Sequence, residues 1–69
     1  MNTTMKAQGM YDFIKAQVEA GRTCYLATAL RITKIQKKHL IQVRVNGNAL
    51  EILCGKRWID YTHTALSAR

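Results

Sequence analysis

IQVRVNGNALEILC, residues 41–54, is the stretch that decides the fold of this chain of 69 residues. Apolar and polar residues alternate through its first half, which is the period of a β-strand with one buried face. Asn46-Gly47 follows, and this pair tolerates the positive φ that a type I′ hairpin turn needs at both central positions. The stretch therefore predicts a β-hairpin with one strand over residues 40–45 and a returning strand over residues 49–54. In the first strand the predicted buried face carries Ile41, Val43 and Val45, and the open face carries Gln42 and Arg44.

Residues 55–69 extend this antiparallel arrangement. Gly55-Lys56 predicts another tight turn, because glycine adopts the backbone conformations that turns require. Residues 57–61 predict a short last strand, and residues 63–69 predict a frayed tail or a single helical turn. Trp58 lies in that last strand, where it either closes the core or faces outward as a contact residue. Alternation at the end of a sheet does not decide between the two.

Residues 23–35, before the hairpin, are rich in β-branched and aromatic residues and also predict strand. Thirteen residues exceed the usual strand length of ~5–6, so we expect a bend or bulge near Thr28-Ala29 that splits the segment. Alternation places Cys24, Leu26, Leu30 and Ile32 on one side, and Tyr25, Arg31 and Thr33 on the other. Residues 36–39 are polar and predict a turn.

The N-terminal segment predicts a helix over about residues 5–20. Its apolar residues recur at helical spacing and define one face, formed by Ala7, Met10, Tyr11, Ile14 and Val18. Thr3 or Thr4 is expected to cap the start of the helix. Gly21 follows the end, where a left-handed backbone conformation is favoured.

These elements predict one small α+β domain over residues 1–69, with an N-terminal helix packed on a three- to four-stranded antiparallel sheet. Such a sheet buries one face under the helix and leaves the other exposed. With 48% hydrophobic and 22% charged residues, the composition is that of a globular protein. No apolar run approaches the ~18 residues of a membrane span. The N-terminus lacks the apolar core of a signal peptide, so we expect a cytoplasmic protein without a membrane partner.

The residues that usually carry chemistry are few and scattered. Cys24 and Cys54 lie thirty positions apart, and only His39 and His63 add further soft ligands. This spacing predicts two reduced, half-buried thiols and neither a metal site nor a cofactor. The four carboxylates form no close pair, and no nucleophile or phosphate-loop motif is present, so we expect a protein that is not an enzyme.

The positive charge is the strongest functional signal. The net charge is +7, and residues 31–57 hold seven lysines and arginines against a single glutamate. Surfaces usually mix both signs, so this imbalance favours a functional basic surface over lysines that merely keep turns soluble. The predicted contact residues are Arg31, Lys34, Lys37, Lys38, Arg44, Lys56 and Arg57. Nucleic acid and an acidic protein surface fit these residues equally well.

Two stretches resemble known proteins. Gly55-Lys56-Arg57-Trp58-Ile59-Asp60 resembles the C-terminal strand of small anti-CRISPR inhibitors of type I surveillance complexes. Residues 23–35 resemble small phage and prophage proteins in their basic-Thr-aromatic start and their Ala-Thr-Ala-Leu-Arg run. The resemblance implies a phage or mobile-element protein that docks on a host nucleic-acid-handling complex. Its lysines and arginines would lie where guide or target nucleic acid otherwise runs.

Three functions are therefore open at this point. The first is a phage-type anti-CRISPR or related anti-defence inhibitor that binds a host nucleoprotein complex through a basic sheet and its turns. The second is direct binding of DNA or RNA by the same residues. The third is a small structural or regulatory homodimer that pairs through the open sheet face or the last strand.

Overall fold

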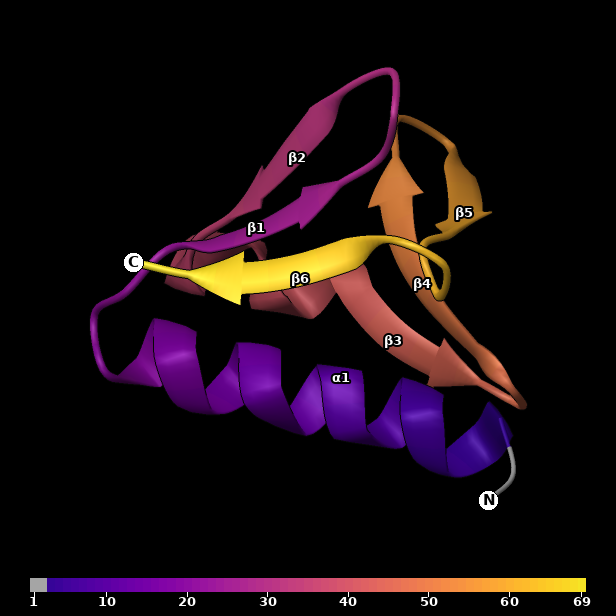
Figure 1. The fold of residues 1–69 in the computed structure, drawn as a ribbon, viewed down its shortest axis with the longest axis horizontal. Helices are drawn as coiled ribbons and strands as arrows, with labels where there is room; N and C mark the ends of the chain where they lie inside the picture. Colours follow the sequence, from indigo (N-terminus) through magenta and orange to yellow (C-terminus); the bar gives the residue numbers. More distant parts are fainter. Residues whose placement is uncertain (1–2) are drawn as a thin grey trace.

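The computed structural model describes the backbone of residues 3–69 and the side chains of residues 6–69. The elements are α1 (Thr3–Glu19), β1 (Cys24–Ala27), β2 (Ile32–Ile35), the 3-10 helix η1 (Lys37–Gln42), β3 (Val43–Asn46), β4 (Ala49–Cys54), β5 (Arg57–Asp60) and β6 (Ala65–Ala68). The strands form two antiparallel three-stranded sheets, in the orders β2-β1-β6 and β3-β4-β5 (Figure 1). We call them sheet A and sheet B. The predicted α+β class is confirmed.

The N-terminal helix follows its apolar pattern. Ala7, Ile14 and Val18 are fully buried, so the predicted inward face is confirmed. The helix ends in a Schellman motif, in which Gly21 has a φ of 85° and donates its N–H to the Val18 carbonyl at 3.1 Å. The Arg22 N–H donates to the Gln17 carbonyl at 2.9 Å. A residue with a Cβ would be strained at position 21. The expected caps Thr3 and Thr4 fall outside the described side chains.

Sheet A begins with a hairpin that divides residues 23–35 as expected. The division is a complete reversal, because Thr28 accepts hydrogen bonds from the N–H groups of Leu30 and Arg31 and so closes a four-residue loop. The reversal changes which residues face inward. Ile32 lies opposite Ala27 and is 66% exposed, and Leu30 is 95% exposed at the loop. Their predicted place on the buried side was wrong, and Thr33 and Ile35 face inward instead.

The third strand of sheet A comes from the C-terminal segment. Residues 63–69 were expected to form a frayed tail or a single helical turn, and this was wrong, because Ala65–Ala68 forms β6 and pairs antiparallel with β1. The ladder continues beyond the strand, since Thr23 and Arg69 exchange two backbone hydrogen bonds of 2.9 Å each. Leu66 lies opposite Leu26 and packs against the core. Pairing with β1, forty residues earlier in the chain, therefore makes a strand of a segment whose own sequence does not predict one.

Sheet B contains the predicted hairpin, with the turn shifted by one residue. Asn46 pairs with Ala49, so Gly47 and Asn48 are the two central turn residues. Gly47 has a φ of 60° and no other turn residue has a positive φ, which fits a type II′ turn and not the expected type I′. The first strand is also shorter than predicted, because residues 37–42 form η1. Ile41 therefore lies in η1, 87% exposed, and its predicted burial was wrong.

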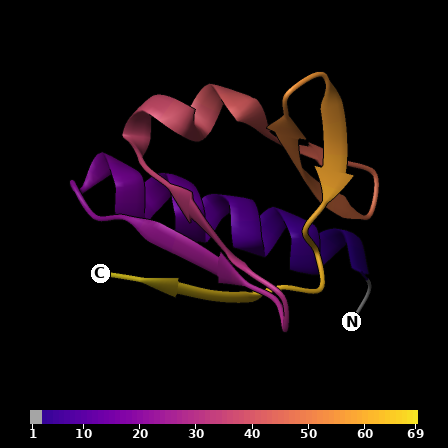
Figure 2. The same cartoon turned by 90° about the horizontal axis from the view of Figure 1, so that it is seen from above.

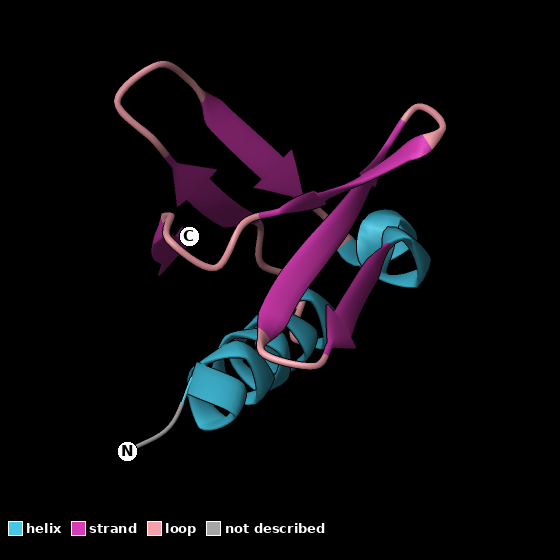
Figure 3. Cartoon of the chain, turned by 90° about the vertical axis from the view of Figure 1, so that its right-hand side faces the viewer, coloured by secondary structure: helices cyan, strands magenta, loops and turns pink. Residues whose placement is uncertain are grey.

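One core joins the helix to both sheets. The helix contacts β1 and β6 of sheet A, β3 and β4 of sheet B, and η1. Figures 1 and 3 show the β1–β2 and β4–β5 turns at the same end of the molecule, away from the helix, and Figure 2 shows that the two turns diverge from each other there. The core residues are Ala7, Met10, Ile14, Val18, Cys24, Leu26, Ile35, Val43, Leu50, Ile52 and Tyr61.

Residues 61–64 connect the two sheets and are held by polar contacts. The Tyr61 N–H donates to the Leu50 carbonyl at 2.7 Å, and the Leu50 N–H donates to the buried hydroxyl of Thr62 at 2.8 Å. That hydroxyl donates in turn to Asp60 Oδ1, which also accepts the Thr62 N–H at 2.7 Å. These bonds keep the pKa of the Asp60 carboxyl below its usual value. These contacts fix the direction in which the chain leaves sheet B, and so place β6 beside β1.

Candidate functional site

The outer face of sheet A, turned away from the core, gathers an aromatic ring and cations. Register places Tyr25 of β1 opposite Lys34 of β2 on one side and Ser67 of β6 on the other. Opposite residues of antiparallel strands point to the same face, so these three side chains share the outer surface. The face comprises Thr23, Tyr25, Ala27, Ile32, Lys34, Ala65, Ser67 and Arg69.

Charge on this face has one sign. Lys34 and Arg69 are both exposed; Lys34 lies on β2, and Arg69 directly follows β6. The Arg69 guanidinium carbon lies 5.9 Å from the centre of the Tyr25 ring. None of the outer-face residues that the structure describes is an aspartate or a glutamate. An anion that approaches the sheet here meets no repulsive group on the face itself.

A shallow hollow lies on the same face. It has a volume of about 250 Å³ and is lined by Tyr25, Ala27, Ile32, Ser67 and Arg69. The small side chains of β1 and β6 form the depression, and the exposed Ile32 forms one wall. Apart from the Tyr25 and Ser67 hydroxyls and the Arg69 guanidinium, this lining offers apolar and aromatic surface.

The outer face of sheet B also has a basic and an aromatic residue, but they are engaged with each other. Arg44 lies opposite Glu51, and its Nε and Nη2 both lie 2.8 Å from Glu51 Oε1. The Arg44 guanidinium carbon is 3.9 Å from the centre of the Trp58 ring. Trp58 is thus an outward-facing, half-buried residue, and the interpretation that it closes the core was wrong.

Arg31 forms a hydrogen bond at the place where the two sheets meet. Its Nη2 donates to the phenol oxygen of Tyr61 at 3.2 Å, and Thr33 Oγ1 donates to the same oxygen at 3.1 Å. Cys54 Sγ lies 3.7 Å from that oxygen, and either group can be the donor in this contact. Two residues of the β1–β2 hairpin and one of β4 therefore meet at a buried tyrosine. Arg31 stays exposed but has a structural partner.

The remaining predicted contact residues occupy two separate regions. Lys37 and Lys38 begin η1, just beyond the end of β2. Lys56 and Arg57 lie in and after the β4–β5 turn of sheet B, which diverges from the β1–β2 turn in Figures 2 and 3. The seven predicted residues hence form no single patch. Of these residues, Lys34 alone lies on the outer face of sheet A.

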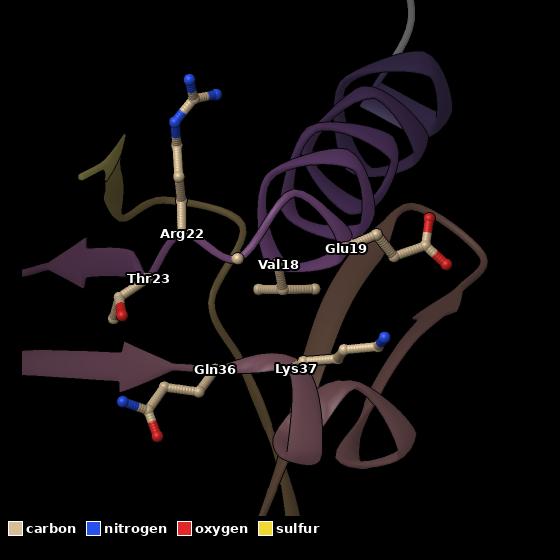
Figure 4. Close-up of a pocket in the computed structure, with 7 residues that line it drawn as sticks. Val18, Glu19, Arg22, Thr23, Gln36 and Lys37 are labelled. Atoms are coloured by element: carbon tan, nitrogen blue, oxygen red, sulfur yellow. The ribbon is translucent and has the colours of Figure 1, made fainter.

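A second hollow lies between the end of the helix and the start of η1 (Figure 4). It has a volume of about 320 Å³ and is lined by Val18, Glu19, Gly21, Arg22, Thr23, Gln36 and Lys37. Figure 4 shows the Glu19 and Lys37 side chains extending to the same side, whereas Arg22 points away. Arg22 Nη1 donates to Gln17 Oε1 at 3.0 Å. The charges around this hollow are mixed, and it offers less to an anion than the sheet A face.

The thiols and other soft ligands do not form a centre. Cys24 is fully buried, its Sγ lies 3.9 Å from the Ile14 carbonyl, and burial raises the pKa of its thiol. Within residues 3–69 no group of three His, Cys, Asp or Glu side chains is arranged to hold a metal ion. The described helices include none that is long and apolar enough to cross a membrane.

Sequence reasoning placed Tyr25 on an open sheet face but missed its neighbours Ser67 and Arg69. Both lie in the segment that was expected to fray. The available signal was weak, because Leu66 is the single large apolar residue of residues 63–69. Comparison with known protein families, curated proteins and solved structures finds no match to this chain.

Proposed function

We propose that this protein binds nucleic acid through the outer face of sheet A. The observation that carries the proposal is the arrangement around Tyr25. Lys34 and Arg69 flank the ring, and the described outer-face residues include no acid. Nucleic acids combine regularly spaced phosphates with aromatic bases, and single-strand binding surfaces pair cations with exposed rings for this reason.

An acidic protein would meet the same cations, but nucleic acid fits the ring and the hollow as well. Neighbouring strands lie about 4.8 Å apart, so the two flanking strands place cations roughly 10 Å apart across the ring. Lys37 and Lys38 follow β2 in the chain and add positive charge beyond the end of that strand. Phosphates can thus be contacted on both sides of a base that lies over Tyr25.

The test is a titration of a fluorescein-labelled oligonucleotide of about ten nucleotides, followed by anisotropy at several salt concentrations. If four phosphates are neutralised on a single strand, log affinity falls against log salt with a slope of about −3. The double variant Lys34→Glu/Arg69→Glu should lose most of the binding and most of the slope. Wild-type protein that binds no oligonucleotide at low salt contradicts the proposal.

The matched control is Lys56→Glu/Arg57→Glu, which makes the same change in net charge on the β4–β5 turn of sheet B. Its affinity should fall only by the general loss of positive charge. Equal losses in the two double variants would show that net charge alone attracts nucleic acid. The outer face of sheet A would then have no special role.

A second candidate function is inhibition of a host nucleoprotein complex, which the resemblance to anti-CRISPR proteins implies. The observation that favours it is the outward-facing pair of Arg44 and Trp58 on sheet B, because tryptophan and arginine are enriched where proteins bind one another. In this arrangement sheet B contacts protein and sheet A contacts the bound nucleic acid. A pull-down from host lysate with and without nuclease separates the candidates. Partners that survive nuclease support the inhibitor, and partners that all disappear support nucleic acid alone.

A further inference from the structure

We infer that the hollow on the outer face of sheet A is a slot for one unpaired nucleobase, which makes the protein a binder of single strands and not of duplexes. This inference rests on the proposed function and adds the substrate class. The slot is formed by the Tyr25 ring, the Ile32 side chain, the small residues Ala27 and Ser67, and the Arg69 guanidinium.

The shape of the hollow suits a flat ring. Ile32, 66% exposed, and the methyl group of Ala27 offer apolar surface beside the tyrosine. A volume of about 250 Å³ is below the ~300–1,000 Å³ of pockets that enclose a whole small ligand. The hollow is therefore suited to one group that projects from a larger molecule. A base projecting from a nucleic-acid backbone is such a group.

The spacing between Arg69 and Tyr25 supports a stacked arrangement. The guanidinium carbon lies 5.9 Å from the ring centre, which is long for a direct cation–π contact but within its range. Bases stack at roughly 3.4 Å, so a base placed between the two planes needs about 7 Å. Arg69 is exposed, so its side chain is free to move away from the ring and admit the base. The base would then lie between the phenol ring and the guanidinium plane.

Polar groups at the rim match the rest of a nucleotide. Ser67 lies opposite Tyr25, where its hydroxyl can donate to or accept from the edge of a base. Lys34 lies on the other side of the ring and can contact a neighbouring phosphate. A duplex presents the same phosphates, but its bases are paired and stacked internally and leave the slot empty. A single strand uses both the cations and the slot.

The experiment compares two strands of equal charge on the wild-type protein. One is a labelled oligothymidylate of about ten nucleotides, and the other is its abasic counterpart with the same phosphates. Stacking of one base is expected to make the thymidylate bind about ten- to a hundredfold more tightly. Equal affinities, or tighter binding of a duplex of the same length, overturn the slot. If both strands bind equally with a steep salt dependence, the proposed electrostatic function stands without it; if neither binds, both proposals fall.

Substitutions locate the slot. Tyr25→Phe keeps the ring and should retain the preference for thymidylate over the abasic strand, whereas Tyr25→Leu should abolish it. Trp58→Leu removes the aromatic residue of sheet B and should leave the preference intact. Quenching of a 2-aminopurine base in the strand reports stacking directly and should disappear only in Tyr25→Leu. Unchanged quenching in that variant overturns the assignment of the ring.

Discussion

Sheets A and B have the same plan, three antiparallel strands whose inner faces meet a common helix, yet their outer faces use charge differently. In sheet B the register sets Arg44 opposite Glu51, and the cation also stacks on Trp58. In sheet A the register sets Lys34 opposite Tyr25, and no acid lies opposite it. A basic residue thus becomes part of the scaffold in one sheet and an available contact in the other. Its partner across the strands decides which.

The largest expected effect tests what the sheets share. Leu26 in sheet A and Leu50 in sheet B are both fully buried. Truncation of either leucine to alanine should cost about 2–5 kcal/mol, and a domain this small rarely has more than ~3–5 kcal/mol to lose. Both variants should therefore be largely unfolded in circular dichroism and in Trp58 fluorescence. A Leu26→Ala variant that unfolds only sheet A would show two separate cores instead of one.

The next largest effect concerns the two lysines at the start of η1, which follow sheet A in the chain. Lys37→Glu/Lys38→Glu should weaken oligonucleotide binding several-fold, but less than Lys34→Glu/Arg69→Glu. The two lysines lie past the end of β2 and off the Tyr25 ring. Each phosphate contact that is lost should lower the salt slope by about 0.7 on a single strand. Affinity identical to wild type would confine the binding surface to the sheet itself.

A substitution on the outer face of sheet B, where Arg44 is paired with Glu51, should lower the stability of the protein but not its affinity for an oligonucleotide. Arg44→Ala removes a cation–π contact and leaves Glu51, only 17% exposed at its side chain, with the Asn46 amide but without its cation. We expect a loss of about 1 kcal/mol in urea unfolding and no change in oligonucleotide affinity beyond the general charge effect. A double-mutant cycle with Trp58→Leu isolates the stacking contribution. A large and specific loss of binding in Arg44→Ala would mean that sheet B also contacts the nucleic acid.

The smallest effect concerns the connection between the sheets. Hydrogen bonds from the Thr62 hydroxyl and N–H hold the pKa of Asp60 below its usual value. A lowered folded-state pKa means that the carboxylate stabilises the fold above the ordinary aspartate pKa of ~3.9, and that this stabilisation disappears as the pH falls through the folded-state pKa. Asp60→Asn keeps an acceptor oxygen but removes the charge. It should be less stable than wild type near neutral pH.

Thermal unfolding of wild type and Asp60→Asn, measured from about pH 2 to pH 7, checks the direction of this effect. The difference in melting temperature should shrink as the pH falls. Thr62→Val serves as a control that removes the hydroxyl donor but leaves the carboxylate. A difference that stays constant over the whole range would mean that the charge of Asp60 does not contribute.

Much of the fold could be predicted because local patterns and local backbone demands agree. The helix, its end at Gly21, the strands over residues 49–54 and 57–60, and the hairpin at Gly47 follow from periodicity and glycine conformation. The errors occur where a residue's face depends on a distant partner. This applies to the exposed side chains of Ile32 and Ile41 and to the strand within residues 63–69. Segments this short do not by themselves determine their structure or which of their side chains are buried.

The candidate site shows the same division. The sequence identified a basic middle segment and an open sheet face that contains Tyr25, but it wrongly placed Arg31 and Thr33 on that face. It did not indicate that Arg44 is neutralised by Glu51, that Arg31 bonds to Tyr61, or that Arg69 lies over Tyr25. Charge can be counted along a chain, but whether a charge is paired depends on strand register and on contacts between sheets.

By itself, then, the sequence determined the class of the fold, its single N-terminal helix, its turns at glycine and its excess of positive charge. These properties depend on residues within a few positions of one another. Tertiary structure alone decided that β6 completes sheet A and that one outer face keeps its cations unpaired around an aromatic ring. The physical reason is the pairing of β1 with β6, forty residues apart, which places side chains together that no local pattern connects.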